Sequence, residues 1–375
     1  MKHLLLLGAG HAHALVLKNL AAAPLKDVTV TVVSPHALAP YSGMVPGWLA
    51  GAYRWQDICI NFAPLARAAG ARFVLGEVAA LEAANGRVSL ADGQTLQADV
   101  VSLNIGSTLH APPGLPGQTL ALRPLAELGQ AWPAVLTNLQ APHAGPALKV
   151  AAVGGGAAGV ECLLAALTAL GRQRTRLAHG TLFSGSDRLL PGLAPRAAAA
   201  ALAALTAAGV DVVLRTRADV ARLQPFDLVL WAAGAQAHEW PAHSGLAVSE
   251  AGFVCVDADL RSTSHPQVFA AGDCAHWQPP LPKAGVYAVR MGPVLAHNLR
   301  AALCSSPLQR YVPQEKTLAL LATGAGQAIA TRGNWCLAGP LWGRAAWRWK
   351  DHIDRAFLAQ FKRLDAQAAS ADLNS

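Results

Sequence analysis

The stretch Val150-Ala-Ala-Val153-Gly154-Gly-Gly156-Ala-Ala-Gly159 decides the fold of this chain. It is a short apolar run, then a glycine-rich turn, then a helix-like segment, which is the context of the dinucleotide-binding fingerprint G-x-G-x-x-G. A related pattern, Leu4-Leu-Leu-Leu7-Gly8-Ala-Gly10, stands near the N-terminus. One such turn indicates a nucleotide-binding protein, and two in one chain indicate two dinucleotides that exchange electrons.

The two turns follow the fingerprint to different extents. The first glycine makes the tight turn, the second lets the backbone approach a pyrophosphate, and the helix behind them offers free N–H groups. In the N-terminal turn, however, His13 stands where a third small residue normally lets the helix pack closely on the strand. We expect there either a wider gap between helix and strand or an imidazole that faces outward.

Three further apolar runs end in glycine, at Gly106, Gly234 and Gly272. The last of them continues into Asp273. Because α/β sheets bind ligands at the carboxyl ends of their strands, Asp273 is expected to accept a hydrogen bond from a sugar-alcohol hydroxyl group there.

In this order the motifs resemble the flavoproteins that have two dinucleotide-binding domains. That group includes the pyridine nucleotide-disulfide oxidoreductases and the type II NADH dehydrogenases. The segments at 34–47 (SPHALAPYSGMVPG) and 282–292 (PKAGVYAVRMG) are also similar to an NADH dehydrogenase-like flavoprotein that occurs alone or fused ahead of selenide, water dikinase. The resemblance extends to about Phe361, and it implies FAD at the first fingerprint and NAD(P)H at the second.

The motifs and the resemblance together define the candidate site. The residues expected at the cofactors on the FAD side are Gly8, Gly10, His11, Ser34, Pro35, Ser42, Gly43, Val78, Gly106, Gly272, Asp273, Val286 and Tyr287. Those expected on the NAD(P)H side are Gly154, Gly156, Ala157, Ala158, Gly159, Ser184 and Gly234.

Two residues are candidates for a catalytic role. The resemblance places Glu161 near the nicotinamide, whereas the alternative is a carboxylate that is only stabilised by the helix N-terminus. Lys283 precedes a glycine-containing turn and would stabilise the charge of the reduced flavin.

The predicted fold class is α/β, with two Rossmann-like dinucleotide-binding domains and a small C-terminal α+β unit. The NAD(P) domain is expected to be inserted in the FAD domain. The expected boundaries are residues 1–115 and 246–310 for the FAD domain, 116–245 for the NAD(P)H domain and 311–375 for the C-terminal unit. Strands are expected at 318–322 and 327–331.

The composition indicates a soluble or peripheral enzyme of the cytoplasm. Hydrophobic residues make up 53% of the chain, but no uncharged apolar run reaches the ~18–20 residues of a membrane-spanning helix. The formal net charge of +8 comes with basic residues bunched at 171–176 and 344–363. No nucleic-acid-binding motif accompanies them, so we expect no nucleic acid partner.

The C-terminal stretch 335–361 has two interpretations. It carries Trp342, Trp347 and Trp349 among arginine and lysine residues. Such a stretch either lies at a bilayer interface, on the inner face of the membrane, or packs on the FAD domain as a helix. A homodimer is also left open.

The six cysteines exclude the disulfide reductases, because no Cys-x-x-Cys or Cys-x4-Cys follows the first unit. Cys162 and Cys336 would form a widely spaced pair only if the fold brought them together; otherwise they are inert buried thiols. The thirteen histidines show no metal-ligand spacing, so no metal site is expected. His11 and His13 are interpreted as loop residues near the cofactor.

The acidic residue that usually binds the ribose hydroxyl groups is missing from both units. Ser34 and Ser184 stand at the ends of the two second strands instead. At the second site the missing carboxylate removes a repulsion against a 2′-phosphate, and Arg188 follows four residues later. This pattern favours NADPH or the use of both coenzymes.

The expected function is transfer of a hydride from NAD(P)H to FAD and then of electrons to a small acceptor such as a quinone. The alternatives are a flavin module that acts on a selenium or sulfur species or with a partner protein, and a flavoprotein that senses nucleotides without catalysis.

Overall fold

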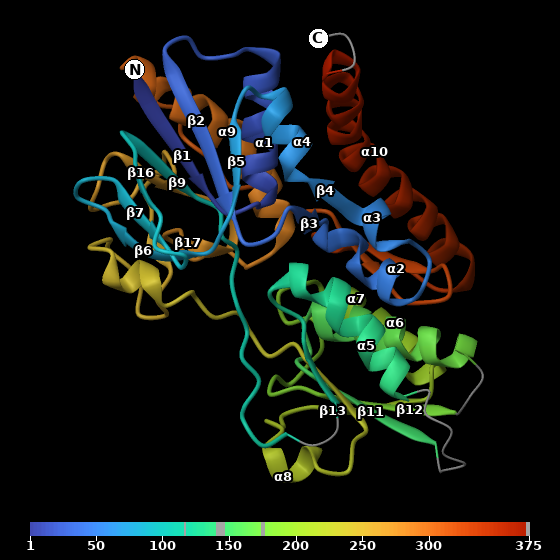
Figure 1. Cartoon of the computed structure of the whole chain (residues 1–375). Helices are drawn as coiled ribbons and strands as arrows, with labels where there is room; N and C mark the ends of the chain where they lie inside the picture. The colour runs from blue at the N-terminus through green and yellow to red at the C-terminus, as the bar shows by residue number, and fades with distance from the viewer. Residues whose placement is uncertain (116–117, 140–146, 174–176, 373–375) are drawn as a thin grey trace.

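The computed structural model describes residues 1–115, 118–139, 147–173 and 177–372. Its upper body in Figure 1 is built on a parallel sheet in the order β16-β9-β1-β2-β5. The strands of this sheet are β1 (Lys2–Leu7), β2 (Val28–Ser34), β5 (Arg72–Leu75), β9 (Val100–Leu103) and β16 (Val268–Ala270). Because β16 comes from late in the chain, the segment between β9 and β16 is inserted into this body.

That inserted segment forms the second parallel sheet, in the lower body of Figure 1. Its order is β10-β14-β11-β12-β13. The strands are β10 (Gln118–Ala121), β11 (Leu148–Val153), β12 (Ala178–Phe183), β13 (Val210–Val213) and β14 (Leu228–Trp231). Each sheet reverses its order beside the strand that carries the fingerprint, as Rossmann-like sheets do. The predicted α/β class, with one Rossmann-like unit inserted in the other, is confirmed.

Continuous apolar runs form the central strands because both faces of each sheet are covered. The leucines of β1, from Leu4 to Leu7, are fully buried. Burying each such side chain contributes on the order of 1.5–3 kcal/mol, so β1 anchors the upper core.

The long helices flank the sheets. In the upper body α1 (His11–Ala22) packs along α9 (Gly285–Cys304), and α4 (Phe62–Ala68) lies beside α1. In the lower body α5, α6 and α7 gather on one side of the sheet (Figure 1). The helices of the lower body are α5 (Leu128–Leu139), α6 (Ala157–Gln173), α7 (Pro195–Ala207) and α8 (Val220–Leu223).

Short elements complete the upper body and the junction between the bodies. The short strands are β3 (Leu38–Pro40), β4 (Cys59–Asn61), β6 (Val78–Glu82), β7 (Arg87–Leu90), β8 (Thr95–Gln97), β15 (Val254–Cys255) and β17 (Ala275–His276). The short helices are η1 (Ser42–Met44), α2 (Val45–Leu49), α3 (Trp55–Ile58), η2 (Leu125–Glu127), η3 (Trp240–His243) and η4 (Gly272–Cys274).

The C-terminal unit is an antiparallel sheet followed by one long helix. The sheet consists of β18 (Ala319–Ala322), β19 (Ala328–Arg332) and β20 (Trp335–Leu337). The helix α10 (Pro340–Asp372) runs up the side of the molecule and packs on α4 (Figure 1). The two strands expected here are therefore present, and the tryptophan-rich stretch contributes β20 and a packed helix.

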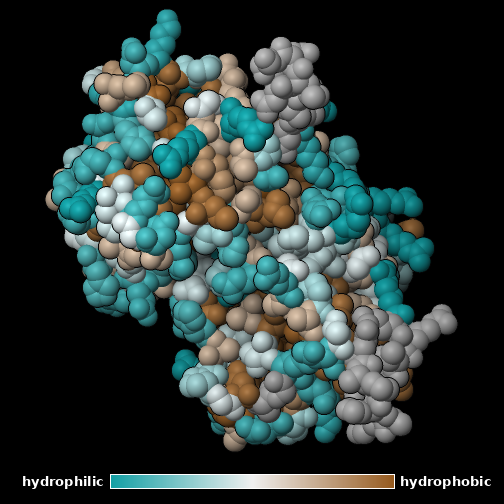
Figure 2. Space-filling model, viewed as in Figure 1, coloured by the Kyte–Doolittle hydropathy of each residue, from teal (hydrophilic) through white to brown (hydrophobic). Residues whose placement is uncertain are grey.

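The surface of the molecule is mixed in character. On the face shown in Figure 2, apolar surface gathers in the middle of the upper body, and hydrophilic residues surround it. None of the helices in the described ranges is both long and apolar enough to cross a membrane.

Candidate functional site

The first fingerprint forms a turn between β1 and α1 that is held by Asn104. Gly8 has a φ of 96°, and a side chain there would come within 2.5 Å of the Asn104 carbonyl oxygen. The side chain of Asn104 accepts hydrogen bonds from the backbone N–H groups of Ala12 (3.0 Å) and His13 (3.3 Å) and donates one to the Ala271 carbonyl (2.6 Å). This one amide therefore ties the start of α1 to the end of β16.

The remaining N–H groups of this turn are free. Those of Ala9 and Gly10 have no hydrogen-bond partner among the described residues. Free N–H groups at a helix N-terminus form a site for an anion such as a pyrophosphate.

His11 and His13 correct one expectation, and the burial of His13 decides between two alternatives. His11 and His13 are not loop residues: both belong to α1, and His13 is fully buried rather than facing outward. Its ring is hydrogen-bonded to the Gly8 carbonyl (2.7 Å, Nδ1) and to the Ser102 hydroxyl (2.9 Å, Nε2). Burial lowers the pKa of His13 to about 4. The imidazole thus fills the space between helix and strand as a neutral group with partners on both sides.

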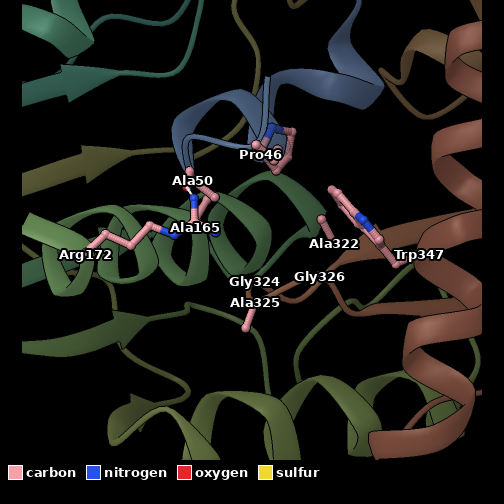
Figure 3. A pocket seen from close by; sticks show the side chains of 11 residues that line it. Pro46, Ala50, Ala165, Arg172, Ala322, Gly324, Ala325, Gly326 and Trp347 are labelled. Carbon is pink, nitrogen blue, oxygen red and sulfur yellow. Dashed lines mark hydrogen bonds between the residues drawn. The ribbon is translucent and has the colours of Figure 1, made fainter. Parts of the chain in front are cut away.

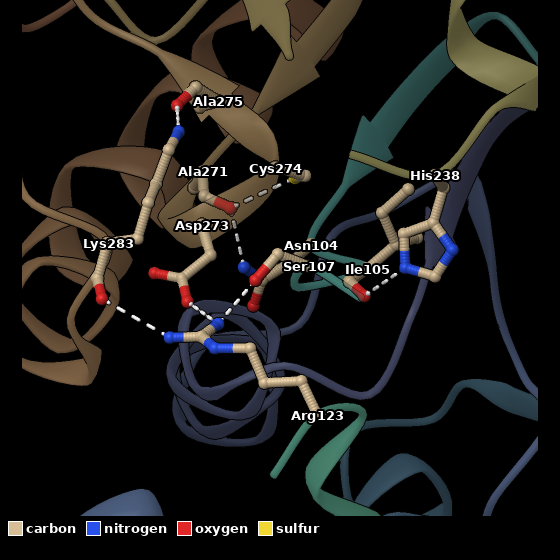
Figure 4. A network of polar contacts seen from close by, with 10 residues as sticks. All are labelled: Asn104, Ile105, Ser107, Arg123, His238, Ala271, Asp273, Cys274, Ala275 and Lys283. Atoms are coloured by element: carbon tan, nitrogen blue, oxygen red, sulfur yellow. Dashed lines mark hydrogen bonds and ion pairs between the residues drawn. The ribbon is translucent and has the colours of Figure 1, made fainter. Parts of the chain in front are cut away.

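Asp273 lies in a polar network at the carboxyl end of β16 (Figure 4). One carboxylate oxygen, Oδ2, forms an ion pair with the guanidinium of Arg123, which also donates to the Ser107 hydroxyl. The other oxygen, Oδ1, has no partner within the described ranges. That oxygen is available to a hydroxyl group of a ligand, and the expected bond to a sugar-alcohol hydroxyl group stays a prediction.

Lys283 points away from this carboxylate (Figure 4). Its ammonium group donates to the Ala275 carbonyl (2.6 Å) and lies 3.7 Å from the centroid of the Phe253 ring. Burial lowers the pKa of Lys283. Its predicted role at the flavin stays a prediction, and its carbonyl oxygen accepts from Arg123 (3.3 Å).

Three segments meet beside His11, the first residue of α1. A side chain at Gly285, where α9 begins, would run into the hydroxyl of Ser42 in η1. The ring of His11 lies 5.3 Å from that of Tyr41, and its Nε2 atom is buried with no hydrogen-bond partner in the described part of the chain. The N-termini of α1, η1 and α9 therefore converge, as do the predicted residues Ser42, Gly43, Val286 and Tyr287 that they carry.

The other residues expected near FAD follow the carboxyl ends of neighbouring strands. Ser34 ends β2, and the N–H group of Gly76 donates to its carbonyl (3.0 Å), which brings the segment before Val78 alongside. Pro35 is exposed beside Ser34. Gly106 follows β9, and a side chain there would meet open space.

The second fingerprint is built as the sequence predicts. Gly154 has a φ of 126°, and a side chain at Gly159 would run into the Gly154 carbonyl, so the helix packs closely on the strand. Gly156, followed by Ala157 and Ala158 at the start of α6, faces open space. The N–H groups of Gly155 and Gly156 have no partner among the described residues.

The ends of β12 and β14 border this turn. Ser184 is buried against Gly155, and its hydroxyl accepts from the Ser186 N–H group (3.2 Å). Gly234 follows β14 and is exposed. Arg188, which the sequence suggested for a 2′-phosphate, instead donates to the carbonyls of Pro191 (2.7 Å) and Leu193 (3.1 Å) in its own loop.

Glu161 connects the second fingerprint to the C-terminal unit. Its carboxylate accepts from the Ala322 N–H group (2.6 Å) at the end of β18. Burial raises the pKa of Glu161 to about 7, although the Lys350 ammonium acts in the opposite direction. The carboxyl group therefore exchanges a proton near neutral pH.

Lys350 and Asp354 form a buried ion pair on α10. Their charged groups are 2.7 Å apart, and Lys350 also donates to the Gly43 carbonyl in η1. Burial raises the pKa of Asp354. Sequence reasoning missed Asn104, Arg123, Lys350 and Asp354. The only signal for the last two was a lysine and an aspartate four residues apart inside an aromatic stretch.

A cavity of about 240 Å³ opens beside Ala322, the residue whose N–H group bonds Glu161 (Figure 3). It lies between α2, α6, the β18–β19 turn and α10, and its walls are almost entirely apolar. Its lining residues are Pro46, Gly47, Ala50, Ala52, Ala165, Arg172, Ala322, Gly324, Ala325, Gly326 and Trp347. Ala322 joins this cavity to Glu161, whereas Arg172, which donates to the Ala50 carbonyl (2.6 Å), is its charged residue.

Neither a disulfide nor a cluster of metal ligands is found among the described residues. All six cysteines are free, and burial raises the pKa of Cys162 far above its usual range. Cys162 lies on α6, and Cys336 lies on β20. Burial raises the pKa of Cys336, although the positive charge of Arg196 in α7 acts in the opposite direction. The described residues contain no group of three or more candidate metal ligands.

Comparisons with known proteins place this geometry in a wider group. A family model described as pyridine nucleotide-disulphide oxidoreductase matches residues 2–298. The chain is 30% identical over 198 residues to a type II NADH:quinone oxidoreductase of Haemophilus influenzae, a match that covers 45% of this chain and 43% of the relative. It is 42% identical over 79 residues to a mitochondrial sulfide:quinone oxidoreductase of Schizosaccharomyces pombe, covering 20% of this chain and 16% of the relative. The matches thus span less than half the length of either curated relative.

Solved structures share the fold over nearly the whole chain. The sulfide:quinone oxidoreductase of Aquifex aeolicus has a TM-score of 0.78 at 16% identity, with 97% of this chain and 92% of that chain covered. The NDH2 of Plasmodium falciparum in complex with NADH has a TM-score of 0.75 at 14% identity, with 96% and 98% covered.

Proposed function

The chain belongs to the pyridine nucleotide-disulphide oxidoreductase family, and we propose that it passes a hydride from NAD(P)H to a bound FAD and then electrons to a quinone or a similar small acceptor. The observation that carries this proposal is the apolar cavity beside Glu161. It lies between α2, α6 and the C-terminal unit, and its described lining includes no fingerprint residue, so it leaves a second substrate a place of its own.

The residues of the upper body fit FAD. Free N–H groups at the start of α1 suit the pyrophosphate, and the free oxygen of Asp273 suits a hydroxyl group of the sugar alcohol. His11, whose Nε2 atom is unpartnered within the described ranges, lies beside the N-terminus of α9, and we place the ring system of FAD there. When bound, FAD accepts a hydride from NAD(P)H and passes two electrons on.

The residues of the lower body fit a nicotinamide nucleotide. The free N–H groups of Gly155 and Gly156 suit its pyrophosphate, and the open space at Gly156 leaves room for the close approach. We place Gly154, Ala157, Ala158, Gly159, Ser184 and Gly234 in the same site.

The cavity suits a flat apolar acceptor, and Glu161 suits its protonation. Reduction of a quinone to a quinol takes two electrons and two protons, of which the hydride of NAD(P)H brings one proton and the solvent supplies the other. Glu161 has a pKa near 7, so its carboxyl group can hold that proton and deliver it at neutral pH. Lys350, through its charge, and the Ala322 N–H group stabilise the carboxylate that remains.

We further propose that α10 touches an anionic membrane surface. Leu341, Trp342, Trp349 and Ile353 are exposed large apolar residues on this helix, among the exposed Arg344, Arg348 and Arg355. Aromatic and basic residues together favour a bilayer interface. The buried residues of α10 pack on the protein, as the second interpretation of the sequence expects, and the proposed membrane contact concerns only the exposed face of the helix.

The function is tested by narrowing the cavity. Ala52 lines it and is exposed, so an indole in Ala52→Trp is expected to occupy part of the cavity without disturbing the core. We expect quinone turnover to fall at least about tenfold, because the acceptor loses its place, while reduction of the flavin by NAD(P)H and turnover with ferricyanide stay unchanged. Ala251→Trp, at an exposed alanine outside the cavity, is the matched control.

Two outcomes decide between the candidates. Unchanged quinone turnover in Ala52→Trp contradicts an acceptor site in the cavity. Turnover that requires a selenium or sulfur species, or a second protein, supports the alternative electron-transfer module instead.

A further inference from the structure

The end of β12 lies beside a segment that carries two arginines. The N–H group of Thr216 donates to the Ser184 carbonyl (2.8 Å), and that of Arg215 donates to the Ser186 carbonyl (2.9 Å). These backbone bonds join the two segments that follow β12 and β13. They fix residues 215–217 next to the turn where a Rossmann-like site receives the adenine ribose.

Arg217 reaches across this turn. A side chain at Gly185 would lie 3.5 Å from Cγ and 4.0 Å from Nε of Arg217, so the arginine side chain covers the glycine directly after Ser184. Arg217 is exposed, and its guanidinium has no ion pair or hydrogen bond within the described ranges. Arg188, by contrast, is bonded to its own loop.

The charges around this place favour an anion. The residue that follows β12 is Ser184, whose hydroxyl already bonds the Ser186 N–H group, so this position carries no carboxylate that would bind two ribose hydroxyl groups or repel a phosphate. Of the nearby carboxylates, Asp219 caps α8 by accepting from the Arg222 N–H group (2.8 Å) and Asp211 pairs with His179 (2.9 Å). Asp187 is exposed in the same turn and is outnumbered by Arg215 and Arg217.

We propose that Arg217 selects a nucleotide with a 2′-phosphate, so that the second site prefers NADPH over NADH. A guanidinium binds a phosphate through two parallel charge-assisted hydrogen bonds, and the free Arg217 side chain offers such a pair. The inference rests on the proposed nicotinamide site and adds the specificity of that site.

Direct binding tests the assignment without turnover. Calorimetry on the FAD-loaded protein compares adenosine 2′,5′-bisphosphate with 5′-AMP, which differ only in the 2′-phosphate. We expect the wild type to bind the bisphosphate at least about tenfold more tightly, and Arg217→Gln to lose that difference while its affinity for 5′-AMP is unchanged. Arg222→Gln removes the same charge from an exposed position five residues away and is expected to keep the preference.

The outcomes separate this inference from the function it rests on. Equal affinity of the wild type for the two nucleotides, or an equal loss of both in Arg217→Gln, overturns the role of Arg217 and leaves a nicotinamide site in place. Failure of both nucleotides to bind overturns the site itself and the inference with it.

Discussion

At the scale of single residues, the ionisation of Glu161 links the proposed chemistry to pH. We predict that Glu161→Gln lowers quinone turnover by roughly 100-fold, because a general acid is lost while flavin reduction by NAD(P)H does not need it. In the wild type, turnover is expected to fall as the pH rises through about 7, where the carboxyl group loses its proton. In the variant that dependence disappears. Stopped-flow measurement of the two half-reactions across this range checks both.

Glu161 is also expected to make the free energy of unfolding depend on pH, which can be measured without turnover. The pKa of Glu161 is raised from 4.5 to about 7, so the folded protein binds this proton more tightly than the unfolded chain. The stability from this group is present below pH 4.5 and is lost as the pH rises towards 7. Glu161→Gln is expected to lose this dependence. A variant with unaltered pH profiles for both turnover and unfolding contradicts the role of Glu161.

His13 is predicted to make the protein sensitive to acid. Burial lowers its pKa from 6.5 to about 4, so between these values the unfolded chain binds a proton that the folded protein does not. The free energy of unfolding is then expected to fall by about 1.4 kcal/mol per pH unit as the pH drops through this window.

The substitution His13→Ala tests this expectation by denaturant unfolding of the FAD-loaded protein. It is expected to cost about 1–3 kcal/mol at pH 7, since the Gly8 carbonyl and Ser102 lose their partner, and to reduce the acid slope. His352→Ala, at an exposed histidine of α10, serves as the control that keeps the slope. An acid slope unchanged by His13→Ala counts against the neutral buried imidazole.

Residues with a fixed backbone requirement could be predicted from the sequence, and residues that act at a distance could not. Gly8 and Gly154 are recognisable because their positive φ angles suit glycine. Asn104 and Arg123 bond groups more than ninety residues away, at Ala12 and Asp273. No local pattern in the sequence specifies such partners. His13 was misjudged for the same reason, because Ser102 stabilises it from another strand.

At the scale of elements, α10 has one face that packs on the protein and one face that is exposed. One face buries Lys350, Asp354 and Phe361. Deletion of the tail would therefore remove the bond from Lys350 to η1 as well as any membrane contact of the exposed face. The exposed face is therefore better tested by substitution than by truncation. Its apolar residues Trp342, Trp349 and Ile353 recur at helical spacing and share that face.

We predict that the wild type sediments with vesicles of phosphatidylcholine and phosphatidylglycerol. The combined change Trp342→Ser and Trp349→Ser is expected to lower the bound fraction at least about fivefold, because interfacial burial of the two rings is lost. Added salt should weaken the binding of the wild type, since the arginines attract anionic lipid within a Debye length. Leu202→Ser, at an exposed leucine of α7, is the control. No sedimentation of the wild type at low salt would contradict the membrane contact.

At the scale of the whole molecule, the order of fingerprints and glycine-ended strands was enough to predict two Rossmann-like sheets, one inserted in the other. Short-range patterns define each strand, and the handedness and order of parallel units then leave few arrangements. The meeting of the C-terminal unit with α6 could not be predicted, because a single bond from Ala322 to Glu161 and an apolar cavity carry no sequence signature. The cavity at that junction is the candidate site for a third molecule, in addition to the two nucleotide sites.

The most direct test of the account is anaerobic double mixing of the flavin-loaded protein. The oxidised protein is first mixed with NADPH or NADH, and the reduced protein is then mixed with a small naphthoquinone such as menadione, with the flavin absorbance recorded throughout. We predict that the flavin band is bleached within seconds in the first mixing and returns in the second. A band that neither coenzyme bleaches, or one that stays bleached in the presence of quinone, would contradict it.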